Sequence, residues 1–288
     1  MEGRRAGTPG AERARRHLLE AFPERGLAPI RGLETQTFTF HDPLTGDATE
    51  GVNVLGMVQG TERPELFVVV TAHYDHLGVR NGDIYNGADD NASGTAALLA
   101  LAEVLSEHRP AHSVLFVALD AEEIGLLGAR AFVADSPVSL DSVIVNVNLD
   151  MVSRSEVDEL YAAGTFHYPF LTPLIEEVAA RAPIHLPTGH DSPDLPPGDD
   201  WTMASDHGAF HEVDIPFVYF GVEDHPGYHH PSDTFENITP EFYVHAVNTV
   251  LDFLGVVDRE GEALLERRLG LGDAAPTGTF ASAEGALP

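Results

Sequence analysis

The stretch LFVVVTAHYDH, residues 66–76, decides the fold because it joins a continuous apolar run to a group of polar side chains. A valine-rich run of this length is typical of a strand buried on both faces of a sheet. Further apolar runs follow it at 113–119, 143–149 and 215–220. Segments whose apolar residues have the spacing of a helix lie between and after these runs, at 94–107, 124–134, 169–181 and 240–257. This alternation predicts a single α/β domain with a mixed central sheet and helices on both faces.

The segments on either side of this core complete the predicted domain. An amphipathic helix is expected at 11–22, and two alternating strands at 35–40 and 51–58 are joined by a turn at Thr45–Asp47. The domain is expected to cover residues 1–269. Small residues, glycine and proline dominate 270–288 and predict a disordered tail.

The composition excludes several classes of protein. The chain has 46 acidic and 16 basic residues and a formal net charge of −30, which argues against nucleic-acid binding and against docking on anionic lipid. No run reaches the ~18 apolar residues of a membrane-spanning helix. The absence of cysteine excludes disulfides and thiolate metal sites, and the absence of lysine excludes a Schiff-base lysine. Residues 1–10 carry no apolar core of the signal-peptide type.

Acidic and histidine side chains gather where the apolar strands end. His73, Asp75 and His76 follow the first run, and four further groups lie in comparable places: Asp89-Asp90 before a helix, Glu122-Glu123, Asp150, and the segment 223–233. In open α/β sheets the ligand site lies beyond the carboxyl ends of the strands. Each group alone also fits a helix cap or a surface residue. Five such groups at one edge favour a metal site.

The donor types indicate which metal site to expect. Imidazole and carboxylate without thiolate suit zinc or another divalent first-row ion. Two histidines and three carboxylates exceed the needs of one open tetrahedral zinc and suit two ions that share a bridging carboxylate. Asp75 lies two residues beyond His73 and is expected to orient it. The pair Glu122-Glu123 offers one ligand and one free carboxylate for general-base catalysis.

The motifs also resemble those of a known family. HYDHLG, IYNGADDNASG, AEEIGLLG, NLDM, ASDHGAF and YHHPSDTF occur in that order within residues 66–238. They resemble the two-zinc metallopeptidases that include bacterial leucyl aminopeptidases and glutamate carboxypeptidase. The N-terminal EGRRAGTPG is similar to a segment often found upstream in that family.

The resemblance implies a role for each matching residue. It implies two Zn²⁺ ions held by five ligands: His73 and Asp150 on one ion, Glu123 and His229 on the other, and Asp89 bridging both. Glu122 would be the general base, Asp75 the partner of His73, and Tyr228 a hydrogen-bond donor to the tetrahedral intermediate. Asp206 and His207 would have a supporting role. The peptide bond between Asp89 and Asp90 is expected to be cis.

The implied activity is that of a zinc-dependent aminopeptidase acting on peptides. The acidic segment Thr188–Asp206 is expected near the site, where it would attract a substrate ammonium and repel a carboxylate. A carboxypeptidase, a glutaminyl cyclase on the same scaffold, and a non-catalytic binding module remain alternatives. The resemblance suggests a periplasmic or extracellular location if an upstream segment was removed. The sequence leaves the oligomeric state open.

Overall fold

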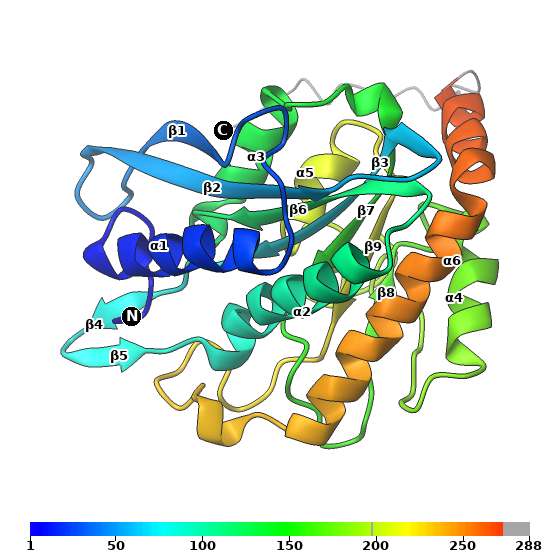
Figure 1. Ribbon diagram of the computed structural model, residues 1–288. Coiled ribbons are helices and arrows are strands. Elements are labelled where there is room, and N and C mark those ends of the chain that lie inside the picture. The colour runs from blue at the N-terminus through cyan, green and yellow to red at the C-terminus, as the bar shows by residue number, and fades with distance from the viewer. Residues whose placement is uncertain (197, 273–288) are drawn as a thin grey trace, which may run out of the picture.

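A computed structural model describes residues 1–196 and 198–272 of the chain. It has three layers, with a mixed sheet between two sets of helices (Figure 1). The strands of the main sheet lie in the order β1-β2-β6-β3-β7-β9-β8. Their bounds are β1 Thr35–His41, β2 Ala48–Val58, β3 Arg63–His73, β6 His112–Leu119, β7 Val143–Leu149, β8 Tyr161–Ala163 and β9 Phe217–Gly221.

Four neighbouring strands at the centre of the sheet are parallel, and the strand pairings on both sides of them are antiparallel. β6, β3, β7 and β9 run in one direction, whereas β2 pairs antiparallel with β6 and β8 pairs antiparallel with β9. Every residue of β6 and β7 is buried, as expected of parallel strands covered on both faces. The carboxyl ends of these four strands therefore meet at one edge of the sheet.

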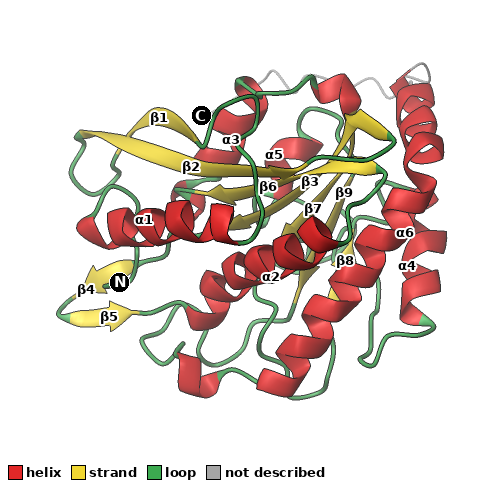
Figure 2. Cartoon of the chain, viewed as in Figure 1, coloured by secondary structure: helices red, strands yellow, loops and turns green. Residues whose placement is uncertain are grey.

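Helices cover both faces of the sheet (Figure 2). On one face lie α1 Pro9–Glu24, α2 Gly94–Glu107 and α6 Pro240–Gly272, with α4 Thr172–Ala179 packed against α6. Their apolar side chains share one core with the sheet. On the other face, α3 Leu127–Ala134 and α5 His207–His211 contribute to a second core that includes Phe132 and Phe210. The predicted α/β fold with helices on both faces is confirmed.

Several elements differ from the predictions in extent. α6 runs fifteen residues past the expected end at Val257, because the polar half of the helix still buries Leu264. Its last three residues, 270–272, belong to the segment expected to be a tail; the rest of that segment lies outside the described residues. A small hairpin of β4 Gly78–Arg80 and β5 Asp83–Tyr85, and the short β8 and α5, were not predicted. Such three-residue strands carry too little periodicity to be recognised.

The described helices do not include a candidate for crossing a bilayer, since none is both long and apolar enough.

Candidate metal centre

The sheet brings the predicted polar groups to one place. β3 ends at His73, β6 ends just before Asp120 and Glu122, and β7 ends just before Asp150. The loop before α2 supplies Asp90 from between these strand ends. Among the described residues, two groups of imidazole and carboxylate side chains have their ligand atoms close enough to hold a metal ion: His73 with Glu122 and Asp150, and His76 with Asp90 and Glu123.

The first group is centred on His73. Its Nε2 lies 3.2 Å from Asp150 Oδ1, 3.4 Å from Asp90 Oδ1 and 4.0 Å from Glu122 Oε2. His73, Asp90 and Asp150 are all buried. Three carboxylates therefore lie within 4.0 Å of one imidazole nitrogen at the ends of β3 and β7.

The second group lies on the other side of Asp90. Asp90 Oδ2 is 3.1 Å from His229 Nε2 and 3.6 Å from His76 Nδ1. Glu123 Oε1 is 2.7 Å from His76 Nδ1, and Glu123 Oε2 is 3.5 Å from His229 Nε2. The two oxygens of Asp90 thus face different groups, which is the arrangement required of a bridging carboxylate.

The structure places Asp90, rather than the expected Asp89, between the two groups. Asp89 points away from both groups: its Oδ1 accepts hydrogen bonds from the backbone N–H and the hydroxyl of Ser153, at 2.7 and 2.8 Å. Its Oδ2 lies 3.1 Å from His225 Nε2. Asp90 takes the central position instead. The cis peptide bond also lies one residue later than expected, between Asp90 and Asn91.

Local geometry explains why Asp90 rather than Asp89 faces the site. Gly87 adopts a φ of +56°, and a Cβ there would meet the carbonyl oxygen of Asp90. Gly94 lets the start of α2 approach the end of β7, since a Cβ would lie 2.4 Å from the carbonyl oxygen of Leu149. The carboxylate of Asp233 accepts the backbone N–H groups of both Asp89 and Asp90. These contacts fix the turn and hence which aspartate points inward.

The remaining predicted residues lie beside the two groups. Asp75 Oδ1 accepts the backbone N–H of Glu122 at 3.0 Å and lies 3.6 Å from His73 Nδ1, which is longer than a hydrogen bond. The ring of Tyr228 stacks on that of His229, with centroids 3.9 Å apart. Asp206 is fully buried, and neither of its carboxylate oxygens has a hydrogen-bond partner in the part of the chain that the structure describes. His207 donates from Nε2 to the carbonyl oxygen of Trp201 and accepts at Nδ1 from the side-chain amide of Asn148, rather than reaching the groups.

The burial and crowding of the carboxylates shift their pKa values. Burial raises the pKa of Glu122 well above its usual value, raises that of Glu123 to about 7 and raises that of Asp90. Burial also opposes ionisation of Asp150, but the neighbouring His73 outweighs it and lowers the pKa of Asp150. So many buried acids in one place are costly unless a cation offsets their charge.

The side chains present fit a pair of divalent metal ions. All the facing donors are carboxylate oxygens and imidazole nitrogens, the ligands that zinc takes in the absence of thiolate. Buried polar atoms within the groups have no hydrogen-bond partner among the described residues, including Glu123 Oε1 and both nitrogens of His76. Buried polar atoms are normally paired, and a metal ion would give these atoms a partner.

A cleft of about 320 Å³ opens over these groups. Its floor is formed by Asp90, Glu122, Glu123 and Asp150, and its walls include apolar side chains of Leu126, Met151, Trp201, Met203 and Val222. Among the described residues that line it, none is an arginine, and the chain has no lysine. The cleft thus combines an acidic floor with an apolar wall.

The predicted loop Thr188–Asp206 only partly lines this cleft. Trp201 and Met203 face it, whereas the carboxylate of Asp191 is buried elsewhere and accepts the backbone N–H groups of Gly164 and Phe166. The carboxylate of Asp200 accepts hydrogen bonds from its neighbour Thr202. The acidic side chains near the cleft therefore come mainly from the strand ends rather than from this loop.

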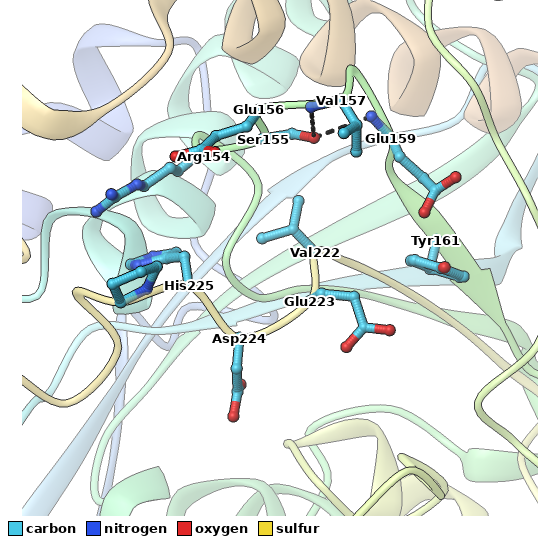
Figure 3. A pocket seen from close by; sticks show the side chains of 11 residues that line it. Arg154, Ser155, Glu156, Val157, Glu159, Tyr161, Val222, Glu223, Asp224 and His225 are labelled. Carbon is cyan, nitrogen blue, oxygen red and sulfur yellow. Dashed lines mark hydrogen bonds between the residues drawn. The ribbon is translucent and has the colours of Figure 1, made fainter.

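A second cavity of about 230 Å³ adjoins the cleft and shares Val222 and Asp224 with it. Figure 3 shows Glu223 and Asp224 on one side of it and the 154–161 segment on the other, with Arg154 extending along its edge. The hydroxyl of Ser155 accepts backbone N–H groups of Val157 and Glu159 and holds this segment in a turn.

Comparisons with known proteins identify relatives of this chain. The model of peptidase family M28 matches residues 53–254. Aminopeptidase YwaD of Bacillus subtilis is 34% identical over 203 residues, which are 66% of this chain and 41% of that protein. A probable zinc metalloprotease of Leptosphaeria maculans is 37% identical over 109 residues, 37% of this chain and 25% of that protein. The chain therefore spans less than half the length of these curated relatives.

Solved structures share the fold. BSAP, a zinc aminopeptidase from Bacillus subtilis, matches with a TM-score of 0.59 and 29% identity over 73% of this chain and 50% of that chain. A glutaminyl cyclase from Fimbriiglobus ruber matches with a TM-score of 0.70 and 21% identity over 88% of this chain and 90% of that chain, a likeness of fold alone.

Proposed function

Because the chain belongs to peptidase family M28, we propose that it is a zinc-dependent aminopeptidase with two metal subsites that share Asp90. The observation that carries this proposal is the placement of the two Asp90 oxygens, one toward His73 and the other toward His229. His73 and Asp150 would hold one ion, and Glu123 and His229 the other. Zinc, when bound, polarises a substrate carbonyl and lowers the pKa of water.

Glu122 is the residue that moves the proton in this proposal. It lies next to Glu123, and its carboxylate is 4.0 Å from the imidazole of His73. Burial raises its pKa, so it can accept a proton from the attacking water near neutral pH and pass it to the leaving amine. The carboxylate of Asp75 accepts a hydrogen bond from the backbone N–H of Glu122 and so fixes the position of the Glu122 side chain.

Tyr228 is placed to assist at the substrate carbonyl. Its ring is held by stacking on His229, and it lines the cleft beside Asp90 and Glu122. Burial raises its pKa above the ordinary value, so the phenol stays protonated and can donate a hydrogen bond. A donor aimed at the oxygen where negative charge develops lowers the barrier to attack.

The charge of the cleft favours an aminopeptidase over a carboxypeptidase. A pocket that binds a substrate carboxylate needs a cation, most often arginine with its two-point geometry. The described lining of the cleft contains no arginine, and Asp224 adds a further carboxylate at its rim. This surface attracts the ammonium of a free N-terminus. The apolar wall of Trp201 and Met203 suits an apolar first residue such as leucine.

The test compares three substrates with and without a chelator: leucine p-nitroanilide, its N-acetyl derivative, and an N-acetylated peptide with a free C-terminus. We expect zinc-dependent cleavage of the first alone. Cleavage of the C-terminal residue from the acetylated peptide, with leucine p-nitroanilide untouched, would overturn the aminopeptidase assignment.

One observation favours a carboxypeptidase as the second candidate. Arg154 lies at the edge of the adjoining cavity and can reach a carboxylate there. In that case Arg154→Ala would raise the KM for the acetylated peptide at least tenfold. For an aminopeptidase the same substitution leaves the KM for leucine p-nitroanilide within about threefold.

A further inference from the structure

His76 lies inside the candidate metal centre, although neither the sequence analysis nor the proposed function gives it the role of a ligand. It comes three residues after His73, in the turn that follows β3, and its side chain is fully buried. Its Nδ1 is 2.7 Å from Glu123 Oε1 and 3.6 Å from Asp90 Oδ2. Its ring lies against that of His229, with centroids 5.9 Å apart.

The contact between His76 and Glu123 is not an ordinary hydrogen bond. Although Nδ1 and Oε1 are 2.7 Å apart, neither atom has a hydrogen-bond partner with acceptable geometry within residues 1–196 and 198–272. Two polar atoms that are this close yet do not point at each other are arranged to share a third partner. An unpaired buried nitrogen is otherwise costly.

We propose that His76 is a further ligand of the second metal subsite, where its Nδ1 binds the ion beside Asp90 and Glu123. This inference rests on the zinc dependence proposed above. Donors about 2.0–2.2 Å from one tetrahedral ion stand about 3.3–3.6 Å from each other. The 3.6 Å from Nδ1 to Asp90 Oδ2 lies within this spacing, whereas the 2.7 Å to Glu123 Oε1 is shorter, so these two atoms would move apart when an ion enters between them.

A fourth protein donor makes the two subsites unequal. The second subsite would have His76, Asp90, Glu123 and His229, a closed set of the kind found in structural zinc sites. The first would have only His73, Asp90 and Asp150 and would keep a position open beside Glu122, where the reaction needs it. Zinc should therefore bind in two steps, with the second subsite filled first.

The test measures zinc binding directly, by titrating the chelator-treated full chain with zinc chloride against a competing indicator. His76→Asn is the main variant, because its amide nitrogen lies close to the place of Nδ1 and can donate a hydrogen bond to Glu123 but is a poor zinc ligand. His76→Ala removes both abilities. His112→Asn is the matched control: His112 is buried beside Asp258, away from the cleft.

We expect both His76 variants to lower the affinity of the tighter zinc-binding step by at least about 10²-fold. This is the upper end of the loss expected when a residue that only orients a metal ligand is removed. The control should stay within about threefold of wild type. Wild-type affinity in His76→Asn would overturn the proposal, whether or not His76→Ala binds weakly, because a hydrogen bond to Glu123 would then account for the role of His76. Wild-type chain that binds no zinc would overturn it as well.

A second measurement does not depend on how the variants fold. X-ray absorption at the zinc edge counts imidazole ligands in the wild-type chain loaded with two zinc ions. We expect three histidines for two ions, and a count of two would overturn the proposal. Neither experiment uses peptide hydrolysis, so a failure of the aminopeptidase assignment leaves the result on His76 intact.

Discussion

Arg4 connects the N-terminal segment to the metal centre, and its replacement tests how far that segment supports the site. The guanidinium is buried and donates to three backbone carbonyls: Nε to Tyr74 at 2.8 Å, Nη2 to Gly87 at 2.9 Å, and Nη1 to Asn86. Tyr74 follows His73 directly, and the other two residues precede Asp90. The side chain of Arg4 thus joins the two segments that carry the proposed metal ligands His73 and Asp90.

The cost of Arg4→Met follows from these three bonds. A hydrogen bond from a charged donor contributes about 1.5–3 kcal/mol, and methionine fills similar space without donating. Even with partial relaxation, the free energy of unfolding should fall by about 3 kcal/mol or more, and the melting temperature by about 6–12 °C. Because the ligand segments lose their common support, zinc affinity should fall about 10–100-fold.

Arg5→Met is the matched control for this prediction. Arg5 is the next residue, but its guanidinium forms a two-point ion pair with Asp42, at 2.6 and 2.8 Å, instead of contacting the ligand segments. Both variants should melt earlier than wild type, whereas only Arg4→Met should bind zinc more weakly. Equal zinc affinity in the two variants, measured by indicator competition, would refute the reasoning.

Further predictions concern the acidic side chains of the centre. Glu122→Gln should keep both zinc ions in metal analysis and lose at least ~10²-fold in kcat; near wild-type turnover would exclude it as the base. Asp90→Asn should lose zinc while Asp89→Asn keeps it, and the reverse result would restore Asp89 as the bridging residue. Burial raises the pKa of Glu123 from 4.5 to about 7 and that of Asp206 from 3.8 to about 8, so the folded zinc-free chain holds these protons longer than the unfolded chain does. The contribution of these two groups to the stability of the zinc-free chain is then fully present below about pH 4 and is lost as the pH rises through 7 and 8. Melting curves of chelator-treated protein should therefore shift down between pH 5 and 8, and zinc should remove the shift; a flat zinc-free profile would contradict the cause assigned to these pKa values.

The central part of the fold was predictable because buried parallel strands leave a strong signal. The apolar runs at 66–72, 113–119 and 143–149 coincide with β3, β6 and β7, and the bounds of α2 match the predicted helix. Each of these segments buries enough apolar side chains to show its period in the sequence alone. The hairpin β4–β5 and the three-residue β8 have no such period, since their pairing depends on neighbours that are distant in the chain.

The choice between adjacent acids was not accessible from the sequence. Asp89 and Asp90 both precede a helix, and periodicity gives no reason to prefer either one. The decision is made by Gly87, which permits the turn, and by Asp233, whose carboxylate receives both backbone N–H groups from 144 and 143 residues further along the chain. In this turn, neighbouring residues point in different directions: the carboxylate of Asp89 contacts Ser153, whereas that of Asp90 faces the candidate metal centre.

His76 and Arg4 show the same limit for residues that lie next to a recognised motif. The sequence places His76 beside a strand end, but only the packing of β3 against β6 brings its ring to Glu123, which is 47 residues away. Arg4 lies in a polar segment with no periodicity, and its partners are 70 to 83 residues distant. Both residues act across the sheet edge, where parallel strands from separate parts of the chain end together. The sheet therefore determines which polar residues meet, and the local turns determine which of them face the metal centre.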